Sequence, residues 1–122
     1  MEKIVRLDDI KNLFTGIIVN YQIGDFEYEF LEICNLEEVD EMIEKFIIPQ
    51  YKSLDEDQKE WLKDSLSYFL TYETEKLLRL NDDGYIPFDF SNNCNAFFKR
   101  IWNKIFMDNN FKYVGFPDKI LY

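Results

Sequence analysis

The chain has 122 residues, 47% of them hydrophobic and 18% aromatic, and it carries a formal net charge of −10 with no histidine. A chain of this length suits a single domain over residues 1–122, and its apolar content excludes intrinsic disorder. Histidine is the commonest general base and the most frequent zinc ligand. Its absence, together with the lack of a phosphate-binding glycine motif, argues against an enzyme and against a metal or cofactor.

The N-terminal quarter of the chain allows two interpretations. Apolar side chains recur at helical spacing over residues 7–21, whereas the β-branched run 17–19 favours a strand. Residues 26–30 alternate as a strand does, with a hairpin turn available at Gly24, yet residues 26–33 also fit one face of a helix. Because the rest of the chain reads as helical, we favour helices here and keep a β-hairpin as the alternative.

Residues 36–48 carry the clearest helical pattern in the chain. Their apolar side chains recur at helical spacing, and Asn35 followed by Glu38 suits an N-cap with a reciprocal side-chain contact. Pro49 is expected to end this helix, because proline lacks a backbone N–H and disfavours a helical residue before it.

A second helix is expected after Ser53, which opens a capping-box pattern over residues 53–56. Acidic side chains in its first turn complement the helix dipole. Apolar residues from Trp61 to Leu78 continue the pattern, so the helix is expected to reach about six turns. Gly84 would then serve as its C-cap.

A third helix is expected to start after Ser91 and to continue to about Met107, preceded by an aromatic loop over residues 85–90 that packs onto the helices. Together these patterns predict a mainly α fold, a single-domain bundle of four to five helices. A small α+β domain, with the N-terminal hairpin and a short strand at 111–114, is the alternative.

Two cysteines and the N-terminal charges bear on the compartment. Cys34 and Cys94 stand sixty positions apart without a CxxC partner, and their neighbours predict buried, reduced thiols. The first nine residues hold charges where a signal peptide needs an apolar stretch, and no apolar run approaches the ~18 residues that cross a bilayer. We therefore expect a cytoplasmic protein that is neither exported by that route nor embedded in a membrane.

The net negative charge is concentrated in one third of the chain. Fourteen acidic side chains and four lysines lie between Asp25 and Asp64, and their balance of −10 equals that of the whole chain. Acids and bases cancel in the remaining residues. A field of one sign favours capture of a partner of the opposite sign, so we expect a basic protein partner.

The acids of the first two expected helices fall into stripes. On the helix over 36–48 four carboxylates recur at i, i+3, i+4 and i+7. The last two lie beyond the reach of the helix dipole, so compensation of the dipole does not explain them. On the next helix three carboxylates recur at i, i+3 and i+7. If these helices form an antiparallel hairpin, the stripes would merge into one acidic face with a tyrosine pair beside it. The alternative is a solvated face that serves solubility. The candidate partner-binding residues are Glu37, Asp40, Glu41, Glu44, Asp57, Glu60, Asp64, Tyr68 and Tyr72.

In size, acidity and the stripe formed by Glu37, Asp40, Glu41 and Glu44, the chain resembles the immunity proteins of bacterial polymorphic-toxin and contact-dependent growth-inhibition systems. The resemblance implies an immunity or antitoxin-type inhibitor that neutralises a cognate toxin by direct binding. A nuclease is the expected toxin, because clefts that hold phosphate are basic. The alternatives are a nucleic-acid mimic that inhibits a DNA- or RNA-binding protein, and a non-catalytic adaptor or structural subunit that docks through aromatic surface. Neither direct nucleic-acid binding nor membrane binding is expected.

Overall fold

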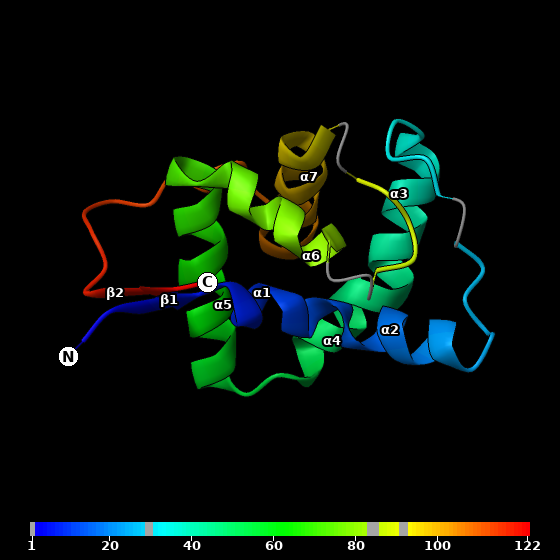
Figure 1. Ribbon diagram of the computed structural model, residues 1–122, viewed down its shortest axis with the longest axis horizontal. Coiled ribbons are helices and arrows are strands. Elements are labelled where there is room, and N and C mark those ends of the chain that lie inside the picture. Colours follow the sequence, from blue (N-terminus) through cyan, green and yellow to red (C-terminus); the bar gives the residue numbers. More distant parts are fainter. Residues whose placement is uncertain (1, 29–30, 83–85, 91–92) are drawn as a thin grey trace.

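The computed structural model describes residues 2–28, 31–82, 86–90 and 93–122 (Figure 1). Helices make up 65% of it and a two-stranded parallel sheet joins the ends of the chain, so the predicted mainly α class is confirmed. In chain order the elements are β1 (Ile4–Arg6), α1 (Leu7–Lys11), the 3₁₀ turn η1 (Asn12–Phe14), α2 (Thr15–Gln22), α3 (Leu36–Met42), the π-helical turn η2 (Ile43–Ile47), α4 (Ile48–Ser53), α5 (Glu56–Tyr72), the 3₁₀ segment η3 (Thr74–Leu78), α6 (Arg79–Asp82), α7 (Cys94–Phe106) and β2 (Lys119–Leu121).

The small sheet is built from opposite ends of the chain. β1 and β2 pair in parallel, with Ile4 opposite Lys119. Just before the sheet, the Lys3 backbone N–H donates to the Asp118 carboxylate at 2.6 Å. Because parallel strands need a long connection between them, no local pattern announces this pairing. The short strand that the α+β alternative placed at 111–114 is not formed, and that stretch is irregular.

The N-terminal segment is helical as far as Gln22. α1, η1 and α2 follow one another without a loop, and Ile10, Phe14 and Ile17 on their inner side are fully buried. The β-branched run 17–19 therefore lies in a helix, because burial of Ile17 in the core outweighs its preference for a strand. The β-hairpin alternative is wrong, since its first strand is helical.

The segment after α2 does not form the helix expected over 26–33. Its described residues, 26–28 and 31–34, are irregular or form turns, although Phe26 and Tyr28 are buried. The two residues between these ranges lie outside the described part of the chain. Apolar spacing alone does not separate a helical stripe from a loop that folds its aromatic rings onto the core.

α3, η2 and α4 form one helical segment that continues through Pro49 to Ser53, so the expectation that Pro49 ends the helix is wrong. The wider π-helical turn η2 comes directly before α4, and the proline occupies the first turn of α4. This local rearrangement accommodates the backbone hydrogen bond that proline cannot donate. The N-cap prediction is confirmed, because the Asn35 side chain accepts a hydrogen bond from the Glu38 N–H at 3.3 Å.

α5 begins later and ends earlier than the sequence predicts. Its N-cap is Asp55, whose carboxylate accepts from the Gln58 N–H at 2.8 Å while the Gln58 side chain accepts from the Asp55 N–H at 3.1 Å. Ser53 instead ends α4 and donates its hydroxyl to a carbonyl within that helix. At Glu73 the backbone leaves the helical region, with φ −141° and ψ 53°, and η3 continues in a new direction (Figure 1). The expected C-cap Gly84 lies outside the described residues.

α7 confirms the third predicted helix, which ends with Met107 in the left-handed conformation at φ 61° and ψ 28°. Ser91, after which the helix is expected to start, lies outside the described part of the chain, as does Tyr85 of the aromatic loop. Phe88 and Phe90 of that loop are buried, as expected.

One cluster of buried side chains connects the elements, from β1 to the segment before β2. α7 contributes to its centre, where the Phe98 ring packs edge-on against Phe14 and Phe90 with centroids 6.1 and 5.3 Å away. Figure 1 places α5 and α3 on opposite sides of α7. This separation decides where the acids of the two helices lie.

The two thiols differ in burial. Cys94 is buried and Cys34 is exposed, and neither forms a disulfide, so the prediction of burial is wrong for Cys34. Cys34 lies in the irregular segment before α3, outside any helix or strand. Burial raises the pKa of the Cys94 thiol to about 12. Within the described ranges, no helix combines the length and the apolar character that a bilayer span requires.

Candidate partner-binding surface

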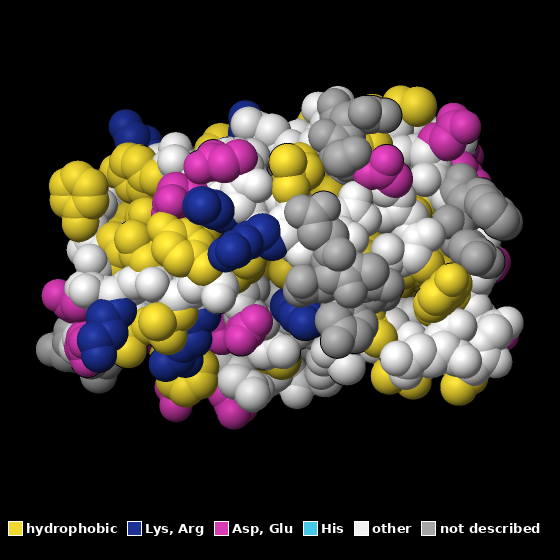
Figure 2. Space-filling view, viewed as in Figure 1, with side chains coloured by type: hydrophobic (Ala, Val, Ile, Leu, Met, Phe, Trp, Pro, Cys, Tyr) yellow, Lys and Arg dark blue, Asp and Glu magenta, His cyan; other side chains and the backbone are white. Residues whose placement is uncertain are grey.

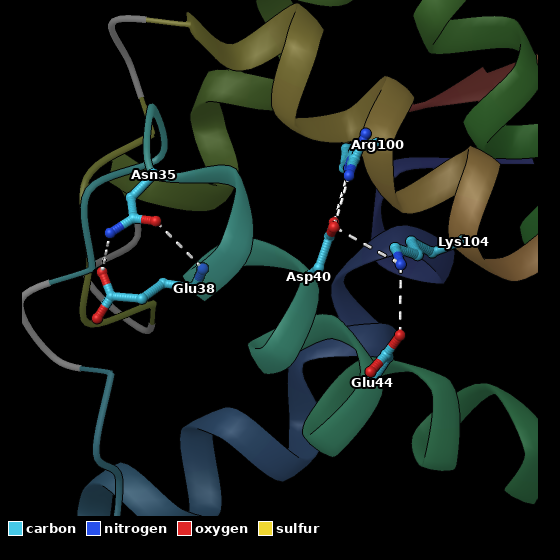
Figure 3. Close-up of polar contacts among 6 residues, drawn as sticks. All are labelled: Asn35, Glu38, Asp40, Glu44, Arg100 and Lys104. Carbon is cyan, nitrogen blue, oxygen red and sulfur yellow. Dashed lines mark hydrogen bonds and ion pairs between the residues drawn. The ribbon is translucent and has the colours of Figure 1, made fainter.

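Asp40, a member of the predicted acidic stripe, faces α7 (Figure 3). The Arg100 guanidinium donates to both Asp40 carboxylate oxygens, with its Nε at 2.6 Å, and the Lys104 ammonium lies 3.6 Å from the same carboxylate. The hydrogen bonds from Arg100 are the main reason that the pKa of Asp40 lies below its ordinary value, and both positive charges add to the effect. Asp40 therefore ties α3 to α7 through a two-pronged ion pair.

Glu44 also turns toward α7. The Lys104 ammonium lies 3.3 Å from the Glu44 carboxylate, although the Glu44 side chain remains 61% exposed. Arg100 and Lys104 are four residues apart on α7, so they present their charges on one face of that helix. Two of the four carboxylates in the predicted stripe are thus paired within the fold, Asp40 closely and Glu44 through an exposed contact.

The outer side of α3 keeps its acids. Glu37 and Glu41 are exposed, and among the described residues neither forms an ion pair. Their spacing of four residues places them on one face of the helix. Next to Glu37, the Glu38 carboxylate accepts a hydrogen bond from the side-chain amide of the N-cap Asn35 at 3.0 Å (Figure 3).

The loop between α2 and α3 brings further acids to this side. Lys45 of η2 pairs with Glu27 of the loop, and this contact raises the pKa of Lys45. The charges of Glu41 and Asp25 also lie close enough to add to the increase. These side chains form the acidic pole, which consists of Asp25, Glu27, Glu37, Glu38 and Glu41, with Lys45 among them.

Sequence reasoning missed Asp25 and Glu27 as site residues and gave Glu38 only a capping role. The density of acids along this stretch of the chain was the available signal. Helical periodicity could not select the two loop acids, because their place beside α3 depends on the contact with Lys45.

The acids of α5 line a separate groove of about 400 Å³ beside β1; they are Asp57, Glu60 and Asp64. Lys3 and Arg6 line the same groove, and the Lys3 ammonium lies 3.3 Å from the Asp64 carboxylate. These cations offset part of the negative charge, which weakens the field that a partner would meet. Because α3 and α5 lie on opposite sides of α7 (Figure 1), the two stripes do not merge into the continuous face that the sequence suggested.

Tyr68 and Tyr72 lie at the far end of α5, away from the acidic pole. Tyr68 is buried and its hydroxyl donates to the Glu73 carboxylate at 2.8 Å; burial first, and this bond second, raise its pKa well above the ordinary value. Tyr72 is 46% exposed and its ring stacks on Phe116 with centroids 6.0 Å apart. With exposed Val114, these two rings form the aromatic patch. Figure 2 shows apolar side chains, with basic ones beside them, over the end of the molecule that carries the sheet.

The chemistry open to these surfaces is ionic and apolar contact. The described residues contain no group of three or more cysteine and carboxylate side chains placed to hold a metal ion. The acidic pole suits ammonium and guanidinium groups, and the aromatic patch suits an apolar surface. Comparisons with protein-family models, with curated proteins and with solved structures found no match.

Proposed function

We propose that the protein is an inhibitor of the immunity or antitoxin kind, which binds a basic toxin through the acidic pole. The observation that carries the proposal is the division among the acids of α3: Asp40 is tied to α7, whereas Glu37 and Glu41 face outward. The loop acids Asp25 and Glu27 extend the outward-facing charge. Carboxylates of this kind speed the capture of a cationic partner, and charge pairs formed in the complex slow its release.

A nuclease is the class of toxin that this surface suits best. Its cleft must be basic to hold the phosphates of a nucleic acid, so the carboxylates of the acidic pole would compete for the same cations. Such an inhibitor acts by occupying the cleft or its approaches and needs no catalytic group. The α5 groove, where Lys3 and Arg6 lie among the acids, is a secondary contact in this proposal.

Charge reversal at the acidic pole tests the proposal. In an E37K/E41K variant both altered side chains are exposed, so the fold is expected to persist while association with the toxin slows at least about tenfold at low salt. The partner is captured from the source cell on immobilised wild-type protein and then purified. Its association rate is measured by stopped-flow fluorescence, and its activity is titrated against the inhibitor.

A D8K/E75K variant is the matched control, because it makes the same change in net charge at exposed positions on α1 and η3, outside the acidic pole and the α5 groove. It is expected to slow association much less than E37K/E41K does. A partner that associates equally fast with both variants, or that keeps its activity at equimolar inhibitor, would contradict the proposal.

The aromatic patch supports a second candidate, an adaptor that docks through apolar surface. Val114 and Phe116 are 87% and 85% exposed, which is unusual for such side chains on a surface without a partner. For an adaptor, V114S/F116S would abolish partner binding while salt and E37K/E41K had little effect. For the inhibitor, E37K/E41K and high salt would each weaken partner binding strongly, whereas V114S/F116S would bind the partner nearly as the wild type does. Binding curves of both variants at low and high salt separate the two functions.

A further inference from the structure

A groove of about 470 Å³ lies beside the acidic pole. Asp25 and Glu27 supply carboxylates to its wall, and Phe26 and Phe46 supply aromatic rings. Carboxylates next to an aromatic surface form the usual setting for a guanidinium or ammonium group, which pairs with the acids and lies over the ring.

The groove already holds a cation from the chain itself. Lys45 lines it, and its ammonium pairs with Glu27 and lies 5.9 Å from the centroid of the Phe46 ring. Both side chains of the ion pair are about half exposed, at 55% and 53%. Exposed ion pairs contribute little to stability, so Lys45 can give up this position at small cost.

A buried tyrosine hydroxyl lies behind the groove. The Tyr28 ring is 6% exposed and packs edge-on against Phe26 and Phe46, with centroids 5.8 and 6.1 Å away. The Tyr28 hydroxyl lies beside the Glu41 carboxylate without a well-formed hydrogen bond to any described group. Burial first, and the Glu41 carboxylate second, raise the pKa of Tyr28 to about 12. A buried hydroxyl without a well-formed hydrogen bond costs free energy, so Tyr28 places an incompletely satisfied polar group directly behind the two rings of the groove.

We propose that this groove receives an arginine side chain of the basic partner, and that Lys45 occupies its place in the free protein. The inference rests on the proposed function and names the chemical group that the acidic pole recognises. Arginine suits the groove better than lysine does, because its planar guanidinium can stack on Phe46 while it donates to the carboxylates of Asp25 and Glu27.

The test uses N-acetyl-arginine amide as a probe of the groove, with binding followed by NMR at the ring resonances of Phe26 and Phe46. Lys45→Met removes the competing cation, so the variant is expected to bind the probe at least about threefold more tightly than the wild type. Glu27→Gln keeps Lys45 but removes a carboxylate, and it is expected to bind at least about threefold more weakly.

Lys59→Met is the matched control. The Lys59 ammonium also pairs with a carboxylate, Glu56 at 3.7 Å, and lies over an aromatic ring, Tyr51 at 5.4 Å, but away from the groove. This variant is expected to bind the probe as the wild type does. Equal affinity of the wild type, Lys45→Met and Glu27→Gln would overturn the inference, and so would a gain in Lys59→Met equal to that in Lys45→Met.

The same variants separate the groove from the proposed function. A captured toxin is expected to bind Lys45→Met more tightly and Glu27→Gln more weakly than the wild type. A toxin that is inhibited but does not distinguish these variants would overturn the groove and leave the inhibitor in place. If the probe binds the variants in the expected order but the captured partner is not basic, the groove would still bind cations, whereas the proposed inhibition of a basic toxin would be contradicted.

Discussion

Identical side chains on one helix take different roles because of what lies opposite them. Asp40 and Glu41 are neighbours on α3, yet Asp40 meets Arg100 of α7 while Glu41 faces outward. Arg100 follows Asp40 by sixty positions, so nothing near Asp40 in the sequence separates it from Glu41. The ion pair gives Asp40 a structural role in the contact between α3 and α7.

Loss of this pair should destabilise the protein in a pH-dependent way. Asp40→Asn is expected to lower the free energy of unfolding at neutral pH by about 2 kcal/mol, because it leaves the half-buried Arg100 without its charged acceptor. The pKa of Asp40 is lowered in the folded state, so its stabilising effect is present above the unfolded-state pKa and is lost as the pH falls through the folded-state value. The difference between wild type and variant should therefore shrink below about pH 4 in urea unfolding curves.

Glu44→Gln serves as the control for that measurement. The Glu44 side chain is 61% exposed, so loss of its pair with Lys104 is expected to cost at most about 0.5 kcal/mol. A variant Asp40→Asn that unfolds at the same urea concentration as the wild type would show that the tie between α3 and α7 contributes nothing.

At the scale of elements, helix ends depend on which residue has the right backbone conformation as well as the right side chain. Ser53 and Asp55 both suit an N-cap by type, but only Asp55 has the extended backbone and the reciprocal contact with Gln58. Pro49 likewise lies within a helical segment, because the π-helical turn before it accommodates the missing N–H. Residue type thus predicts that a helix boundary or distortion is near, and the backbone decides where.

The two cap candidates can be separated by substitution. Asp55→Ala is expected to lower the free energy of unfolding by about 1 kcal/mol, because the Gln58 N–H at the start of α5 loses its acceptor. Ser53→Ala removes only a hydroxyl that donates within the last turn of α4, so it is expected to change stability by less than about 0.5 kcal/mol. Chemical denaturation of both variants measures the difference. An equal loss in the two would argue against Asp55 as the cap.

At the scale of the whole molecule, charge is distributed unevenly. The acidic pole holds five carboxylates, and those of Asp25, Glu27 and Glu41 lie close to Lys45. Lys3 and Arg6 lie among the acids of α5, on the other side of α7. Like charges at close range repel one another, so the acidic pole is expected to reduce the stability of the free protein.

Salt should relieve this repulsion. The melting temperature of the wild type is expected to rise between roughly 20 and 300 mM sodium chloride as the charges are screened. The E37K/E41K variant should be more stable than the wild type at low salt, by a few tenths of a kcal/mol for each repulsive pair removed, and should depend less on salt. Thermal unfolding followed by circular dichroism measures both effects. A wild-type melting temperature that falls with salt would instead show that ion pairs outweigh repulsion.

The amino-acid sequence by itself determined the mainly α class, the helices around Leu36 and Phe98, the cap at Asn35 and the region where acids are concentrated. Those features depend on helical periodicity and on contacts within a few residues, which a linear pattern contains. Only the tertiary structure decided that β1 pairs with β2, that Asp40 is held by Arg100, and that the loop acids join Glu37 and Glu41 in the acidic pole. These depend on which segments distant in the chain come to lie side by side, and that is set by the packing of the core.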